Sequence, residues 1–290
     1  MPRLALLLST LIWGATFPAT KAALEQLPPF SFLFLRFMIG LMVTWSLFHA
    51  LGWPLLRDRA LLRRSAIATV FLFVGYATQT VGLRYTTASN SAFITALYVV
   101  LVPLFLRRFE RRTWLAAGLA TVGLWLLVNP SVALNGGDLL SLACAAAFAA
   151  HIVCLEFYAN QGDARSFFLW QLAFVAGLMG PAMVLESPEA ARFAPTAVLL
   201  VALVITGGLA TGAFAVQVWA QQRLPAQQVA LIFALEPAYA AWLAWYFLGE
   251  HLDPQGWVGS GFILIAVLLG ASGTAQPTAS PGPIPGGTPA

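Results

Sequence analysis

Long apolar stretches recur along the whole sequence, and each is long enough to cross a lipid bilayer. The hydrocarbon core is about 30 Å thick, so an α-helix that rises about 1.5 Å per residue needs roughly 17–25 residues to span it. These stretches predict ten transmembrane helices: 4–24, 29–51, 66–83, 87–106, 113–129, 138–158, 166–185, 197–219, 227–248 and 255–272. The predicted fold class is therefore an all-α membrane protein.

The composition supports a membrane location. Hydrophobic residues make up 60% of the 290 residues and charged residues 9%, whereas soluble domains contain about 25% charged residues. The first apolar segment is too long for the core of a signal peptide and contains Trp13, Pro18 and Lys21, so we expect it to remain in the mature protein. The predicted location is the inner (plasma) membrane, where lipid is the surrounding partner.

The positions of the basic residues predict which side of the membrane faces the cytoplasm. With ten spans, eleven of them fall on one side: Arg3, Arg57, Arg59, Arg63, Arg64, Arg107, Arg108, Arg111, Arg112, Arg165 and Arg223. Lys21, Arg84 and Arg192 fall on the other. Because short cytoplasmic loops carry an excess of Lys and Arg, both termini are predicted to be cytoplasmic. The formal net charge of +4 then reflects topology, and we expect no nucleic-acid partner.

The two halves of the sequence resemble each other in the same order. At an offset of 138 residues, "GYATQTVGLRYTTA" lies over "AFAVQVWAQQRLPA", and "ITALYVV" lies over "IFALEPA". This alignment pairs Gln79 with Gln217 and Tyr98 with Glu236. Weaker matches near the beginning and the end of each half keep the same order.

Each half holds five predicted helices, an odd number, so the second half must enter the membrane from the opposite side. We therefore expect two inverted five-helix repeats, 1–130 and 131–272, followed by a disordered Pro/Gly-rich cytoplasmic tail, 273–290. Inverted repeats commonly build secondary transporters, whose substrate site lies near the bilayer midplane. The alternatives are a membrane scaffold or a membrane enzyme that arose by duplication.

Several motifs resemble the drug/metabolite transporter superfamily, in particular its ten-helix, two-repeat branch. They are "LIWGATFPATKAAL", "FLFLRFMIG", "GLRYTTASNSAFITAL" and the long block "LIFALEPAYAAWLAWYFLGEHLDPQGWVGSGFILIAVLLG". The resemblance covers about residues 4–272 and implies export of small metabolites through a central cavity, with neutral and aromatic amino acids among the substrates of its bacterial members. It also suggests that Arg36 forms a structural or gating ion pair and does not belong to the substrate site. Broader drug or nucleotide-precursor efflux is an alternative.

Glu236 and Pro237 lie side by side in an otherwise apolar segment. Proline removes a backbone donor and leaves the Phe233 carbonyl without its helical partner, which lipid cannot replace. A charged carboxylate at the bilayer centre costs about 2.5–3.5 kcal/mol on insertion scales unless it is paired, wetted or protonated. Glu236 is therefore expected to face a cavity, where it binds a substrate ammonium or couples transport to protons; a purely structural hydrogen bond is the alternative.

Other polar residues are placed in the same predicted cavity. Thr95 and Tyr98 share a half-polar stripe of one helix. Gln79 and Gln217 each need a hydrogen-bond partner on another helix or on a ligand. His151 is the one histidine predicted at mid-membrane depth, and it either relays protons or is satisfied structurally.

The first helix contributes Trp13 and Thr16 to the cavity in this prediction. They lie three residues apart on one face of the helix, where the indole can stack on a substrate or simply pack. Pro18 is expected to bend this helix, as Pro237 bends the ninth.

The sequence shows no catalytic constellation, no phosphate-binding glycine loop and no metal-ligand spacing. We therefore predict a protein that is not an enzyme and that has no cofactor and no metal. Its expected partner is a small-molecule substrate. The sequence leaves the oligomeric state open and is compatible with a monomer.

Overall fold

The structure is a computed structural model of the chain that describes residues 1–128, 135–186, 196–249 and 254–271. Within these ranges the regular elements are helices and no strand occurs. The helices are α1 (Pro2–Ala23), α2 (Pro29–Ala50), α3 (Arg59–Gly82), α4 (Ala88–Thr95), α5 (Tyr98–Phe105), α6 (Arg111–Val128), α7 (Gly136–Tyr158), α8 (Ala164–Val184), α9 (Ala197–Leu203), η2 (Val204–Leu209), α10 (Ala210–Gln221), α11 (Ala226–Phe233), α12 (Glu236–Leu248) and α13 (Pro254–Ala271).

Eight helical segments of the described chain are long and apolar enough to cross a membrane. They are 2–23, 29–50, 59–82, 88–105, 136–158, 164–184, 197–221 and 226–247. These eight coincide with eight of the ten predicted spans, although α3 begins at Arg59 and not at residue 66. The other two predicted spans fall on α6 and α13, which are not among the eight.

Two of the segments that we predicted as single helices are each interrupted by two residues. Ala96 and Leu97 separate α4 from α5, and Ala234 and Leu235 separate α11 from α12. At both breaks the chain forms a tighter turn, in which Leu97 N donates to Ile94 O at 3.1 Å and Leu235 N donates to Ile232 O at 3.2 Å. The two breaks are 138 residues apart, the offset at which the halves of the sequence align.

A π-helical segment, η2, joins α9 to α10 within the predicted span 197–219. Its sequence is VITGGL. Such segments usually occur as single turns inside α-helices, where they are frequent at functional sites.

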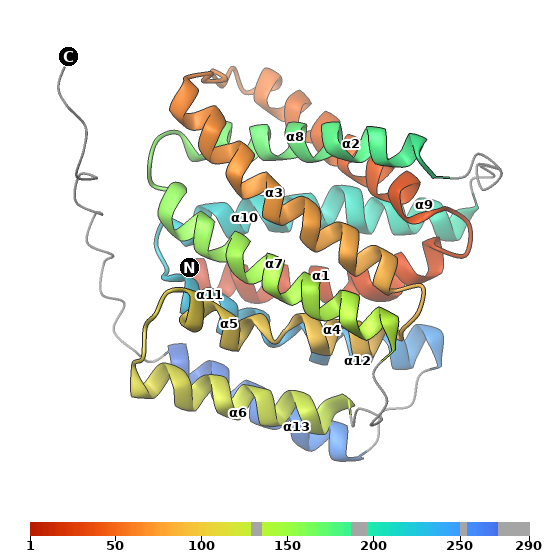
Figure 1. Ribbon diagram of the computed structural model, residues 1–290, viewed down its shortest axis with the longest axis vertical. Coiled ribbons are helices and arrows are strands. Elements are labelled where there is room, and N and C mark those ends of the chain that lie inside the picture. The colour runs from red at the N-terminus through yellow and green to blue at the C-terminus, as the bar shows by residue number, and fades with distance from the viewer. Residues whose placement is uncertain (129–134, 187–195, 250–253, 272–290) are drawn as a thin grey trace.

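The helices pack in pairs across the two halves of the chain. α1 packs on α10 and α12, and α7 packs correspondingly on α3, α4 and α5. α2 packs on α8, and α6 packs on α13. In Figure 1 the helices run across the picture in layers, with α2 and α8 at the top and the α6–α13 pair at the bottom.

Glycines allow the closest of these contacts. A Cβ at Gly14 of α1 would lie 2.7 Å from the Cβ of Tyr239 and 3.0 Å from the carbonyl oxygen of Glu236 on α12. A Cβ at Gly207 of η2 would lie 2.9 Å from the carbonyl oxygen of Arg36 on α2. Small residues let backbones approach where lipid supplies no hydrophobic drive between helices.

Two expectations fall outside the described residues. They are the boundary between the predicted repeats at residues 130 and 131, and the predicted tail 273–290.

Candidate functional site

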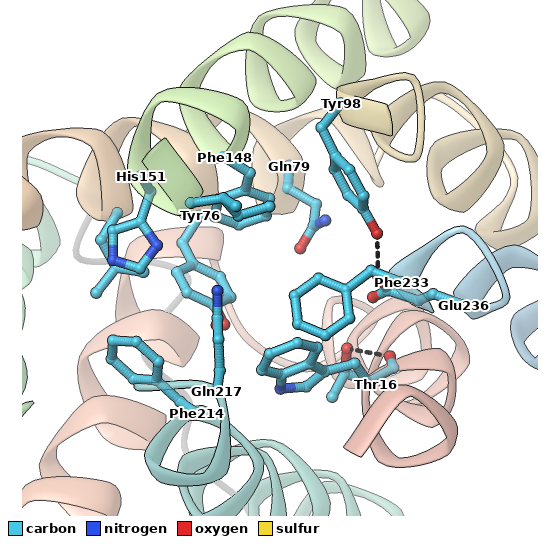
Figure 2. Close-up of a pocket in the computed structure, with 13 residues that line it drawn as sticks. Thr16, Tyr76, Gln79, Tyr98, Phe148, His151, Phe214, Gln217, Phe233 and Glu236 are labelled. Carbon is cyan, nitrogen blue, oxygen red and sulfur yellow. Dashed lines mark hydrogen bonds between the residues drawn. The ribbon is translucent and has the colours of Figure 1, made fainter. Parts of the chain in front are cut away.

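A cavity lies where α1, α3, α7 and α10 meet the broken helices α4–α5 and α11–α12 (Figure 2). Its empty volume is about 520 Å³, which includes the part open to solvent. The lining residues are Trp13, Thr16, Leu72, Tyr76, Gln79, Tyr98, Phe148, His151, Ile152, Phe214, Gln217, Phe233 and Glu236. Seven of the eight residues that we predicted for the cavity are therefore together in its wall.

Tyr98 and Glu236 face each other at the two helix breaks. The Tyr98 hydroxyl donates to Oε2 of Glu236 over 3.1 Å, and each residue is the first of its half-helix, α5 or α12. Tyr98 is 2% exposed, and its ring meets Phe233 edge to face with the ring centroids 6.4 Å apart. Pro237 follows Glu236 directly, at the second position of α12. A carboxylate at this position is favoured by the positive end of the helix dipole.

The two matched glutamines are in different hydrogen-bonding situations. Gln217 Nε2 donates to Oε1 of Gln221 over 2.9 Å, and Gln221 Nε2 donates to the Ile152 carbonyl over 2.8 Å. Gln79 is 7% exposed and lines the cavity, and no hydrogen bond joins its side chain to another residue in the described ranges. Its amide is therefore available to a ligand.

His151 is fixed by a residue outside the cavity wall. Its Nε2 lies 2.9 Å from Oε1 of Gln171. Because Nε2 of Gln171 is directed at the Phe167 carbonyl, 3.5 Å away, the amide oxygen accepts from the imidazole. Figure 2 shows His151 on the opposite side of the view from the Tyr98–Glu236 pair.

Trp13 and Thr16 bring α1 into the wall. Trp13 Nε1 donates to the Ala210 carbonyl over 3.4 Å, and its ring packs edge to face on Phe233 with the ring centroids 4.8 Å apart. Thr16 Oγ1 donates to the Trp13 carbonyl over 2.7 Å. Pro18 lies within α1, which continues to Ala23.

Thr95 is the predicted residue that the structure leaves out of the lining. It is 2% exposed, and its hydroxyl lies 3.8 Å from Sγ of Cys144. As the last residue of α4, it lies just before the break at Ala96 and Leu97. The break separates it from the helical stripe that, in a continuous helix, would have placed it beside Tyr98.

Four aromatic residues of the wall were missed in the sequence. They are Tyr76, Phe148, Phe214 and Phe233. Each lies three residues before a predicted cavity residue, namely Gln79, His151, Gln217 and Glu236. Residues three apart share a helix face, so this spacing is the signal that could have identified Tyr76, Phe148 and Phe214. Phe233 is separated from Glu236 by the break at Ala234 and Leu235.

The chemistry of the wall suits a small solute with an apolar part and a cationic end. Among the described lining residues, Glu236 alone has a side chain that is formally charged at neutral pH. Aromatic faces attract both apolar groups and cations. No group of three His, Cys, Asp or Glu side chains that could hold a metal occurs in the described ranges.

Comparisons with known proteins concern the family and the fold of the chain. A model of the EamA-like transporter family matches residues 2–129 and again residues 135–271. Two proteins of Archaeoglobus fulgidus, each described as an "Uncharacterized transporter", are similar to the chain. One is 35% identical over 272 residues, covering 92% of this chain and 84% of the relative. The other is 28% identical over 286 residues, covering 91% and 94%.

A solved crystal structure shares the fold. It superposes with a TM-score of 0.76 at 18% identity and covers 93% of this chain and 98% of the other. The family match extends over nearly the whole chain, and its members are membrane transporters that act on small molecules. The chain therefore belongs to the EamA-like transporter family of the drug/metabolite transporter superfamily, and it is a multi-pass membrane transporter and not an enzyme.

Proposed function

We propose that this transporter exports small neutral metabolites across the inner membrane by alternating access, with neutral amino acids, aromatic ones included, as its first candidates. The observation that carries the proposal is the cavity at the two helix breaks, with Glu236 and Tyr98 in its wall.

The proposed architecture is two inverted five-helix repeats, 1–130 and 131–272, with ten spans. Three observations support it. The family model matches the chain twice, the helix breaks recur at an offset of 138 residues, and the packing partners of α1 in the second half mirror those of α7 in the first. In inverted-repeat transporters, discontinuous helices commonly form the substrate site near the midplane.

We propose cytoplasmic termini on the basis of the basic residues. The connections α2–α3 and α5–α6, together with the beginnings of α3 and α6, contain eight arginines and lie toward the left of Figure 1, as do the N-terminus and the C-terminal end of α13. The positive-inside rule assigns such an edge to the cytoplasm.

Glu236 and His151 are the proposed proton-coupling residues. Ionisable groups within membrane segments are costly and commonly mark substrate or proton pathways. Glu236 can hold a substrate ammonium or a proton at the same carboxylate, so that binding of one displaces the other. Gln79 and Gln217 supply neutral hydrogen-bonding groups beside it.

Proteoliposomes loaded with labelled amino acids test the proposed function. We expect efflux of at least one neutral amino acid, accelerated by an opposing proton gradient. Glu236→Gln should lower the rate roughly tenfold or more, as expected when a charged hydrogen bond to the solute is lost. Glu25→Gln is the matched control, because Glu25 is an exposed carboxylate. Absence of efflux for every amino acid tested would reject amino-acid export.

A further inference from the structure

Arg36 is a buried cation on α2 without a counter-ion in the described chain. It is 4% exposed, and its Nε atom is buried with no hydrogen-bond partner there. The two salt bridges found between described residues, Arg108–Glu156 and Arg165–Asp163, do not include it. Our expectation that Arg36 forms an ion pair is thus not met within these ranges.

The guanidinium of Arg36 rests on aromatic rings. Its Cζ lies 4.5 Å from the ring centroid of Tyr76 and 5.2 Å from that of Phe37. The backbone beside it is held in place, because η2 passes so close that a Cβ on Gly207 would meet the Arg36 carbonyl. In this position the Nε donor of Arg36 has no partner in the described chain and is available to a carboxylate.

Tyr76 connects this cation to the cavity. Tyr76 belongs to the cavity wall, so Arg36 lies directly behind a single ring of that wall. The ring is packed edge to face between Phe37 and Phe148, with centroid distances of 5.0 and 5.1 Å. The Tyr76 ring therefore stands between the cavity and Arg36.

Glu236 and Arg36 form a complementary pair of charges around this space. Glu236 accepts from the Tyr98 hydroxyl, and no cation lies within 4 Å of its carboxylate in the described ranges. Each unpaired charge inside a membrane is costly. A solute with an ammonium at one end and a carboxylate at the other would give both side chains a partner at once.

We propose that Arg36 is the carboxylate-binding group of the cavity, uncovered when the Tyr76 ring turns aside, and that the site therefore selects zwitterionic solutes. This inference rests on the proposed function, since it concerns the same cavity. An Arg–carboxylate pair is bidentate and charge-assisted, and it would give the Nε donor of Arg36 the partner that it lacks in the described chain. Glu236 receives the ammonium, and the aromatic wall receives the side chain.

The first test needs no variant. Binding to the purified protein is measured by thermal stabilisation for two series, phenylalanine with phenethylamine and hydrocinnamate, and leucine with isopentylamine and isocaproate. Members of a series share their apolar part and differ only in their charged groups. We expect the amino acid to bind roughly ten- to hundredfold tighter than the amine or the acid. An amine that binds as tightly as its amino acid would overturn the assignment of Arg36.

The second test locates the effect. Arg36→Gln should weaken amino-acid binding to the level of the amine and leave amine binding unchanged, and Arg36→Lys should keep part of the preference. Arg59→Gln is the control, because Arg59 is exposed at the start of α3. If Arg36→Gln keeps the full preference, the inference is wrong while amino-acid export stands. If neither series binds to the wild-type protein, this inference and the proposed export of these amino acids both fail.

Discussion

Tyr98 donates a 3.1 Å hydrogen bond to Glu236, and the two residues occupy equivalent positions in the two halves of the chain, 138 residues apart. Each begins the second part of a broken helix. Two positions that correspond in the two halves are therefore in contact with each other. The side chains at these positions differ in chemistry. One supplies a neutral donor and the other supplies a carboxylate.

Tyr98→Phe should remove the donor and preserve the ring that packs on Phe233. Glu236 would lose its hydrogen bond from Tyr98, so we expect slower transport and a loss of about 0.5–1.5 kcal/mol in the free energy of unfolding. Transport into proteoliposomes and thermal unfolding in detergent measure the two effects. Tyr246→Phe, at an exposed site on α12, should change neither. Wild-type transport in Tyr98→Phe would show that the contact has no role.

Gly14→Ala should push α1 away from α12. The added Cβ would lie 2.7 Å from Tyr239 Cβ and 3.0 Å from the Glu236 carbonyl, and overpacking of this kind costs about 1–3 kcal/mol of stability. Because the same contact positions Glu236, transport should fall as well. Gly177→Ala is the matched control, since a Cβ there meets nothing within 4 Å. Equal melting temperatures for the two variants would contradict the proposed close approach.

Gln79→Leu should weaken substrate binding, whereas Gln217→Leu should lower the stability of the protein. Gln79 contacts the cavity without a hydrogen bond to the rest of the described chain, so its loss should raise KM by roughly tenfold with stability unchanged. Gln217 is bonded to Gln221, so its loss leaves a buried amide unsatisfied and should cost about 1–3 kcal/mol of stability. Parallel transport kinetics and unfolding curves measure the contrast. Identical effects of the two substitutions would refute it.

Glu156→Gln should loosen the end of the bundle where α5, α7 and α11 meet. Glu156 accepts from Arg108 at 2.7 Å and from the backbone N of Ala226 at 2.5 Å. Because the Glu156 side chain is 3% exposed but that of Arg108 is 33% exposed, we expect a moderate loss of about 1–2 kcal/mol.

Hydrogen exchange of the backbone amides at the start of α11 should then become faster in Glu156→Gln. Arg165→Gln, which removes an exposed ion pair with Asp163, should leave that exchange unchanged. Unaltered exchange near Ala226 in Glu156→Gln would show that the network does not hold this end.

The helical class and most of the cavity were predictable from the sequence because both depend on local patterns. The length of the apolar segments predicted the spans, and the offset of 138 residues identified Tyr98 and Glu236 as counterparts from the sequence alone. The aromatic wall was missed because we ranked residues by polarity, although Tyr76 and Phe214 lie on the same helix faces as Gln79 and Gln217.

The break before Tyr98 was not predictable by the same means, whereas Pro237 predicted a bend in the segment that contains the second break. Ala96 and Leu97 have good helix propensity, and no glycine or proline marks the interruption before Tyr98. Both α4 and α5 pack against α7, and tertiary packing of this kind is information that a single sequence does not contain. Thr95 was placed by assuming a continuous helix and lies outside the lining for that reason.

The π-helical segment Val204–Leu209 sets the direction in which the side chains of α10 point around the helix axis. One surplus residue in an α-helix turns the downstream part by about 100° about the axis. Phe214 and Gln217 point into the cavity only because of this rotation. A deletion of one residue from VITGGL would therefore direct both side chains elsewhere, with every letter of α10 still in place.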